Sequence, residues 1–176
     1  GIKYMLNFLH DFPQPFMLSS DVTANGTFYD HINTFATCKQ SHRPSQFINL
    51  YYVGKIGKMD IDFNADYLYN KQNNHTTSRE ESRNKTSRTV TSDNQERNRL
   101  FASKLTLGYP VLGGSLSVGA EYTSTNRNDD YVNPEQYVPT SFAQLKESNI
   151  APFMEYTHML PVCQLTVGLR WEAVRF

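Results

Sequence analysis

The residues of this chain that could do chemistry are histidines, cysteines and grouped acids, and their spacing indicates no catalytic site. No histidine has a Ser, Cys or His partner at a spacing typical of nucleophilic catalysis. The five are His10, His31, His42, His75 and His158. Cys38 and Cys163 lie far apart, without the spacing of a zinc site. We therefore expect no enzyme, no cofactor and no metal site. We also expect two unpaired thiols, with one long-range disulfide as the alternative.

Two groups of acidic residues have simpler explanations than a chemical site. Asp60, Asp62 and Asp66 could form paired carboxylates, but their even spacing puts them on one face of an extended strand. Such a row is more typical of the wet lining of a lumen. Asn128-Asp129-Asp130 offers oxygen ligands for calcium but lacks the glycine and the spaced glutamate of an EF-hand loop. We interpret it as a plain turn.

Composition excludes several classes of protein. Lys plus Arg and Asp plus Glu both number 17 in 176 residues, whereas a nucleic-acid binder should be clearly basic. No apolar run approaches the roughly 18 residues of a membrane helix, and residues 1–16 lack the apolar core of a signal peptide. Tyr and Phe number 11 each, beside many small polar residues. This mixture suits strands with one apolar and one wet face.

Strict two-residue alternation predicts these strands. Over residues 58–70, Met59, Ile61 and Phe63 alternate with polar residues, which a helix would scatter around its surface. The same period recurs along the chain, so we predict about eight strands, over 1–10, 26–38, 46–56, 58–70, 98–109, 115–125, 149–160 and 163–174. Pro152 predicts an edge or a bulge, because proline donates no ladder hydrogen bond. Residues 10–26 contain either a further strand near 16–22 or a long turn.

Short and long connections alternate between these strands. Residues 57–58, 110–114 and 161–162 are short connections, whereas 71–97 and 126–146 are predicted to be long polar loops. The first long segment has Val90 as its single aliphatic residue, and its basic excess could contact lipopolysaccharide or another anion, or simply be solvated. The second contains Tyr and Pro residues that favour an ordered loop, with a short helix from Thr140.

These features favour a membrane barrel over a soluble sandwich that buries the same apolar residues. The strand lengths approach the 9–11 or so residues of a tilted transmembrane strand, and short turns facing long loops are typical of outer-membrane barrels. We predict a lipid-facing set of Met59, Ile61, Phe63, Leu116, Val118, Leu165, Val167 and Leu169. The predicted lumen set is Asp60, Asp62, Asp66, Glu121, Arg170 and Glu172. Interfacial aromatic girdles are predicted at Tyr67, Tyr69, Tyr109, Tyr122 and Trp171.

Several strand motifs resemble a known family. They are Tyr52-Val53-Gly54-Lys55-Ile56-Gly57-Lys58 leading into residues 61–67, Gly119-Ala120-Glu121-Tyr122-Thr123, residues 147–156, and Gly168-Leu169-Arg170-Trp171-Glu172. Over roughly residues 46–176 the chain resembles the outer-membrane β-barrel family of Bacteroidetes TonB-dependent receptors. Trp171 departs from the tyrosine that is usual in the last motif. These motifs mark barrel strands and not a chemical site.

The resemblance implies transport across the bacterial outer membrane. In such receptors long loops capture a nutrient, which passes through the lumen when TonB displaces a plug domain. The expected partners are outer-membrane lipid, TonB acting through a plug that is absent from this sequence, and a nutrient ligand or a surface lipoprotein. Ligand-binding residues stay unassigned.

Residues 1–176 are accordingly expected to form a single all-β segment of antiparallel, up-and-down strands within a larger barrel. Phe176 lies on the polar parity of its strand, so we expect no terminal assembly signal there. The alternatives are a standalone eight-stranded barrel with a structural or adhesive role and a soluble β-sandwich binding module.

Overall fold

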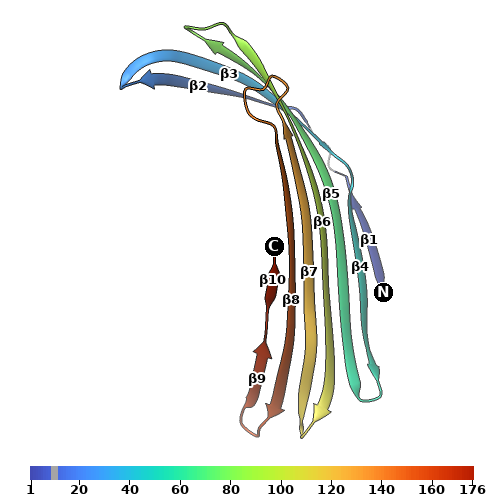
Figure 1. Ribbon diagram of the computed structural model, residues 1–176. Coiled ribbons are helices and arrows are strands. Elements are labelled where there is room, and N and C mark those ends of the chain that lie inside the picture. Colours follow the sequence, from blue (N-terminus) through green and yellow to red (C-terminus); the bar gives the residue numbers. More distant parts are fainter. Residues whose placement is uncertain (9–11) are drawn as a thin grey trace.

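The computed structural model describes residues 1–8 and 12–176, and its strands all belong to one antiparallel sheet (Figure 1). The strands are β1 (Ile2–Asn7), β2 (Gln14–Ala24), β3 (Thr27–His42), β4 (Ser45–Ile56), β5 (Met59–Ser82), β6 (Arg88–Val111), β7 (Gly114–Val132), β8 (Ser141–Met159), β9 (Gln164–Arg170) and β10 (Ala173–Arg175). Seven of the eight predicted strands each match one strand, β1 or one of β3 to β8, and the eighth is divided between β9 and β10. His10, which falls in the first of them, lies outside the described residues. No helix in the described part is long and apolar enough to cross a membrane.

Neighbouring strands in the sequence are mostly neighbours in the sheet. The order is β1-β4-β5-β6-β7-β8-β10, with β9 also paired to β8 and β2 paired to β3. Figure 1 shows one curved layer with β1 and β10 near opposite edges and the β2–β3 hairpin bending away at one end. Within the described residues β1 and β10 are not paired with each other, so this sheet is open.

The described residues contain almost no hydrophobic core. Ala36, Ala65 and Ala151 are the buried hydrophobic residues, whereas Leu169 is 71% exposed and Val167 61%. A soluble sandwich would bury its large apolar side chains between two sheets. The sandwich alternative is therefore wrong for this part of the chain.

The two predicted long loops are wrong, because most of their residues continue the strands. β5 and β6 are 24 residues each, and only 83–87 connect them. β7 and β8 are likewise joined by 133–140, which carries no helix. Asn128-Asp129-Asp130 lies within β7 and is not a turn. These segments lack alternation because both of their faces are polar, and a paired strand needs backbone hydrogen bonds but no apolar face.

The uncertain segment before residue 26 contains a strand. β2 pairs with β3 from Gln14↔Cys38 to Ala24↔Thr27, and Asn25 and Gly26 form the turn with positive φ angles of 51° and 79°. β3 then pairs with the far half of β5, and β4 pairs with the near half. The β2–β3 hairpin is thereby attached to the end of the sheet that carries residues 83–87 and 133–140.

Pro152 does not mark an edge or a bulge, which corrects the sequence-based prediction. β8 is paired on both sides, with β7 and with β9 and β10, and its register is the same before and after Pro152. The missing N–H instead interrupts the opposite strand. The predicted strand over 163–174 separates into β9 and β10 at Trp171 and Glu172, where the Trp171 N–H donates to the Pro152 carbonyl at 3.0 Å.

The pairing register aligns the apolar and polar residues of neighbouring strands, so that each kind lies on one side of the sheet. Met59, Leu116 and Leu165 share a side with every other member of the predicted lipid-facing set, and we call this side the apolar face. The predicted lumen residues all lie on the opposite side, the polar face. One cross-strand row of the apolar face reads Ile61–Leu107–Val118–Met154–Leu169.

The apolar face forms a belt of limited height. On β5 it extends from Met59 to Tyr67, which spans about 27 Å along the strand. A strand tilt of about 40° reduces this to roughly 21 Å, near the apolar band of about 25 Å in outer-membrane barrels. Beyond Tyr69 both faces of β5 are polar, so the far half of this strand projects past the belt into water.

The assignment of the two faces can be tested at neighbouring positions of β7. Val118 lies on the apolar face, opposite Leu107 and Met154, whereas Ser117 lies on the polar face. We expect a fluorophore attached to Val118→Cys in intact outer membranes to be quenched by a lipid-dissolved quencher, and one on Ser117→Cys to be unaffected. Equal quenching at the two positions would contradict the assignment, as would recovery of the protein without membrane.

Candidate functional site

A network of charged side chains crosses the polar face. The Glu121 carboxylate accepts from Lys104 Nζ at 2.9 Å and from Arg170 Nη2 at 2.8 Å. Arg170 Nε also donates to Glu172 Oε1 at 2.6 Å. These four residues come from β6, β7 and β9 and from the break before β10. The structure thus brings together three of the predicted lumen residues and adds Lys104, which sequence reasoning missed.

The acidic row on β5 is held by amides and a lysine. Asn49 Nδ2 donates to Asn64 Oδ1 at 2.8 Å and to Asp66 Oδ1 at 2.6 Å. Lys55 Nζ lies 3.0 Å from Asp60 Oδ1, whose side chain is 56% exposed. These contacts give the Asp60 and Asp66 side chains polar partners beside water. They fit the predicted wet lining better than a pair of catalytic acids.

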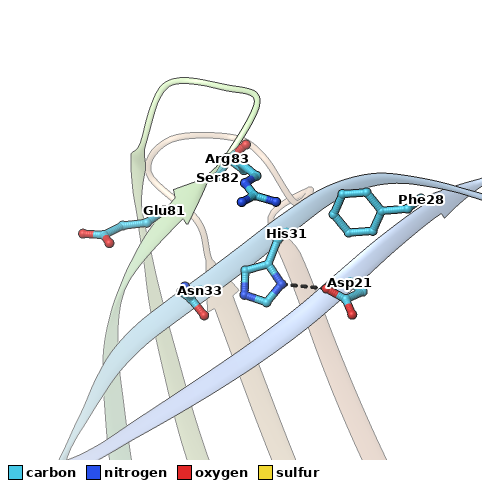
Figure 2. A pocket seen from close by; sticks show the side chains of 7 residues that line it. All are labelled: Asp21, Phe28, His31, Asn33, Glu81, Ser82 and Arg83. Carbon is cyan, nitrogen blue, oxygen red and sulfur yellow. Dashed lines mark hydrogen bonds and ion pairs between the residues drawn. The ribbon is translucent and has the colours of Figure 1, made fainter.

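A polar hollow of about 550 Å³ lies at the projecting end, where the β2–β3 hairpin meets β5 (Figure 2). It is lined by Asp21, Phe28, His31, Asn33, Glu81, Ser82 and Arg83. Both signs of charge, an amide and one aromatic ring face this space, and such a set can bind a small polar ligand by hydrogen bonds and ring stacking.

The hairpin also assembles a chain of hydrogen bonds that the sequence analysis did not predict. His31 Nδ1 lies 2.6 Å from Asp21 Oδ1, and His31 Nε2 lies 3.1 Å from Ser19 Oγ. This is the contact order of a nucleophile–base–carboxylate triad. The Asn25-Gly26 turn was the available signal, because it folds residues 19–21 onto residues 31–33. The expectation that the chain is not an enzyme stays a prediction.

A second histidine repeats this arrangement on the projecting strands. His75 Nδ1 lies 2.6 Å from Asp93 Oδ1, and Thr77 Oγ1 lies 3.3 Å from His75 Nε2. Within the described part of the chain, no group of three or more His, Cys, Asp or Glu side chains could hold a metal ion. Cys38 and Cys163 are free thiols, as predicted.

Asp30 fixes the connection between β5 and β6. This side chain is 3% exposed and accepts from Ser82 Oγ at 2.6 Å and from the backbone N–H groups of Arg83 and Asn84, both at 3.1 Å. The Ser82 hydrogen bond holds the pKa of Asp30 below its ordinary value, and it outweighs burial, which acts in the opposite direction. One carboxylate on β3 therefore orders residues 83–87.

Asn133 orders the other projecting connection. It is 1% exposed, its Nδ2 donates to the Thr91 carbonyl at 2.6 Å, and its Oδ1 accepts from the Val138 N–H at 3.1 Å. Arg88 packs over the Tyr137 ring at 4.6 Å. The prediction of an ordered segment is confirmed for residues 133–140, although a buried amide supports it in addition to the aromatic residues.

The apolar belt, the polar face and the short turns at the end opposite the hollow define a wall of a transmembrane β-barrel. Residues 55–176 match the model of the outer membrane protein beta-barrel family, so the chain belongs to this family and to the outer membrane. A comparison with the curated proteins finds no match. The apolar face accordingly faces lipid.

Glu121 should be the most important member of the charged network. In Glu121→Ala the Lys104 and Arg170 cations lose their shared carboxylate, so we expect a stability loss of about 1 kcal/mol in urea unfolding of the full-length protein in detergent. Glu172→Ala is the matched control on the same face, and it should cost less because it removes a single contact. A larger loss for Glu172→Ala would contradict this ranking.

The turn held by Asp30 should be sensitive to acid. Because the folded pKa is lowered, the contribution of Asp30 is fully present above its ordinary pKa of 3.8 and is lost as pH falls through the folded value. We expect hydrogen-exchange protection of the Arg83 and Asn84 amides at neutral pH and its loss in strong acid. Asp30→Asn should lower this protection already at neutral pH, whereas Asp21→Asn, which changes the neighbouring His31 contact, should leave it intact.

Proposed function

We propose that this chain forms part of the wall of a TonB-dependent receptor of the Bacteroidetes type, which imports a nutrient across the outer membrane. The observation that carries this proposal is the open sheet. Within the described residues its end strands β1 and β10 do not pair with each other, and the sheet combines an apolar belt with an exposed, charged opposite face. Such a wall suits a barrel that is larger than this chain alone.

The exposure of the polar face supports a wide lumen. Lys104 is 54% exposed and Arg170 44%. In a closed barrel of about eight strands the inward side chains fill the interior, whereas large barrels of about 22 strands enclose a plugged lumen. Exposed ion pairs on the polar face therefore favour the receptor over a standalone structural or adhesive barrel.

The residues of this chain would contribute at two stages. The polar hollow around His31 and Arg83 has the parity of the lipid-facing side, so at the projecting end it would contact a surface lipoprotein that delivers the nutrient. The network of Lys104, Glu121 and Arg170 would then line the hydrated path through which the nutrient passes once TonB displaces the plug. In this proposal the chain is not an enzyme, takes no cofactor and binds no nucleic acid.

Binding to TonB tests the proposal. The full-length protein that contains this chain should be purified in detergent and titrated with the periplasmic domain of TonB, with binding followed by biolayer interferometry. We expect saturable binding, because the coupling reaches the barrel through a plug domain. Removal of the segment preceding the barrel should abolish it.

A standalone barrel gives a different result in the same preparation. It would show no saturable binding to the TonB domain in either form. That outcome would overturn the receptor proposal and leave the family assignment intact.

A further inference from the structure

Basic side chains gather on the lipid-facing side of the wall, directly above the apolar belt. Register places five cations on this side, one of them in the row of Tyr67 that ends the belt and four of them one or two rows beyond it. They are Lys71, Arg97, Arg99, Lys146 and Arg175, and we call them the basic collar. Arg99 lies 5.9 Å from the centroid of the Tyr69 ring, so the collar rests on the aromatic girdle.

Carboxylates are nearly absent from this part of the face. Among the described residues of β5 to β10, the first acid above the belt on the lipid-facing side is Asp130, which contacts Arg97 Nη2 at 3.2 Å. Lys71 and Arg97 are directly opposite each other. Like charges in this position destabilise a sheet unless an anion lies between or above them. Asp130 compensates only Arg97, so the collar retains a net positive charge where the phosphate groups of an outer-leaflet lipid would lie.

The collar contains a hollow with the donors that a phosphate needs. It measures about 460 Å³, and its lipid-facing lining is Tyr122, Ser124, Asn126, Lys146, Ser148 and Arg175. Ser124 pairs with Ser148, which pairs with Arg175, and Asn126 pairs with Lys146. Two cations, two hydroxyls and an amide thus converge across three strands. Glu147 also lines the hollow, but it has the parity of the polar face.

The hollow is continuous with the apolar belt. Tyr122, at the lower border of the hollow, pairs with Ile150 on the next strand, and both side chains are exposed on the lipid-facing side. Asn126 lines the hollow beside Lys146, and its side-chain amide can hydrogen-bond a sugar hydroxyl or a phosphate oxygen. A ligand that combines a phosphate, a sugar and acyl chains satisfies all three parts of this surface.

We propose that Lys146 and Arg175, assisted by Ser124, Ser148 and Asn126, bind a phosphate of lipopolysaccharide in the outer leaflet. Lys71, Arg97 and Arg99 continue the contact along the wall. Acyl chains of the same lipid lie on the belt below. This inference rests on the outer-membrane location of the chain and is independent of TonB-dependent import.

Native mass spectrometry of the full-length protein in mild detergent tests the site. The probes are the phosphorylated lipid anchor of lipopolysaccharide and the same anchor after enzymatic removal of its phosphates. We expect the phosphorylated anchor to bind the unmodified protein more tightly. Combining Lys146→Ala with Arg175→Ala should weaken its binding by roughly 10–30-fold, because each cation near a lipid surface contributes about 1 kcal/mol.

Matched variants distinguish a specific site from general charge. Arg127→Ala removes a cation at a similar height but on the polar face, so it should leave lipid binding unchanged. Lys146→Arg keeps the charge and should retain affinity. Inorganic phosphate at the same concentration should not displace the lipid, because it has no acyl chains to lie on the belt. Heat-dependent gel mobility confirms that each variant is folded.

Three results would overturn the proposal. The first is equal binding of the phosphorylated and dephosphorylated anchors. The second is unchanged affinity in the Lys146→Ala, Arg175→Ala double variant, and the third is an equal loss in Arg127→Ala.

Discussion

Backbone hydrogen bonding inside a lipid-exposed layer governs this molecule. Lipid offers no partner for a free N–H or C=O group, so each strand in the belt must be paired along its length with its neighbours. That pairing fixes the register, and the register decides which solvent each side chain meets. Pro152 illustrates how strict this constraint is, because its missing N–H interrupts the opposite strand at Trp171 while the register on both sides is preserved. Because there is almost no buried core, the sheet depends on backbone hydrogen bonds between its strands and on the lipid and water that contact its two faces.

The same pairing of strands continues beyond the belt, where both faces of the sheet contact water. Both faces of the projecting strands are polar, and single buried side chains order the ends. Asp30 binds the N–H groups of residues 83–84, and Asn133 ties residues 133–140 to β6. These contacts hold the connections of the hairpins in place and position the hollow around His31. A long projecting sheet therefore offers a defined surface at the end where loops were expected.

Charge is distributed differently on the two sides of the wall. On the polar face, acids and bases are interleaved, as in the network around Glu121. On the lipid-facing side, the basic collar lies at the upper border of the belt, and acids such as Asp130, Asp93 and Glu81 follow only farther along the strands. The first arrangement suits a hydrated path for varied polar solutes, and the second suits a layer of lipid phosphates. Membership of the outer membrane protein beta-barrel family agrees with both, while the nutrient and the coupling to TonB belong to the proposal.

The two faces of the belt could be predicted from the sequence alone, because alternation with period two is a local property of each strand. The positions of Met59, Ile61 and Asp62 were predictable for this reason, as were the short turns at 57–58 and 161–162. Residues 71–82 and 88–97 could not be recognised as strands before the fold was known, because a segment that is polar on both faces has no periodic hydrophobic signal. Their strand structure depends on pairing with residues far away in the sequence. The same holds for the contact of Ser19, His31 and Asp21 and for the basic collar. Their members come from different strands, and only the pairing between strands sets which of them meet.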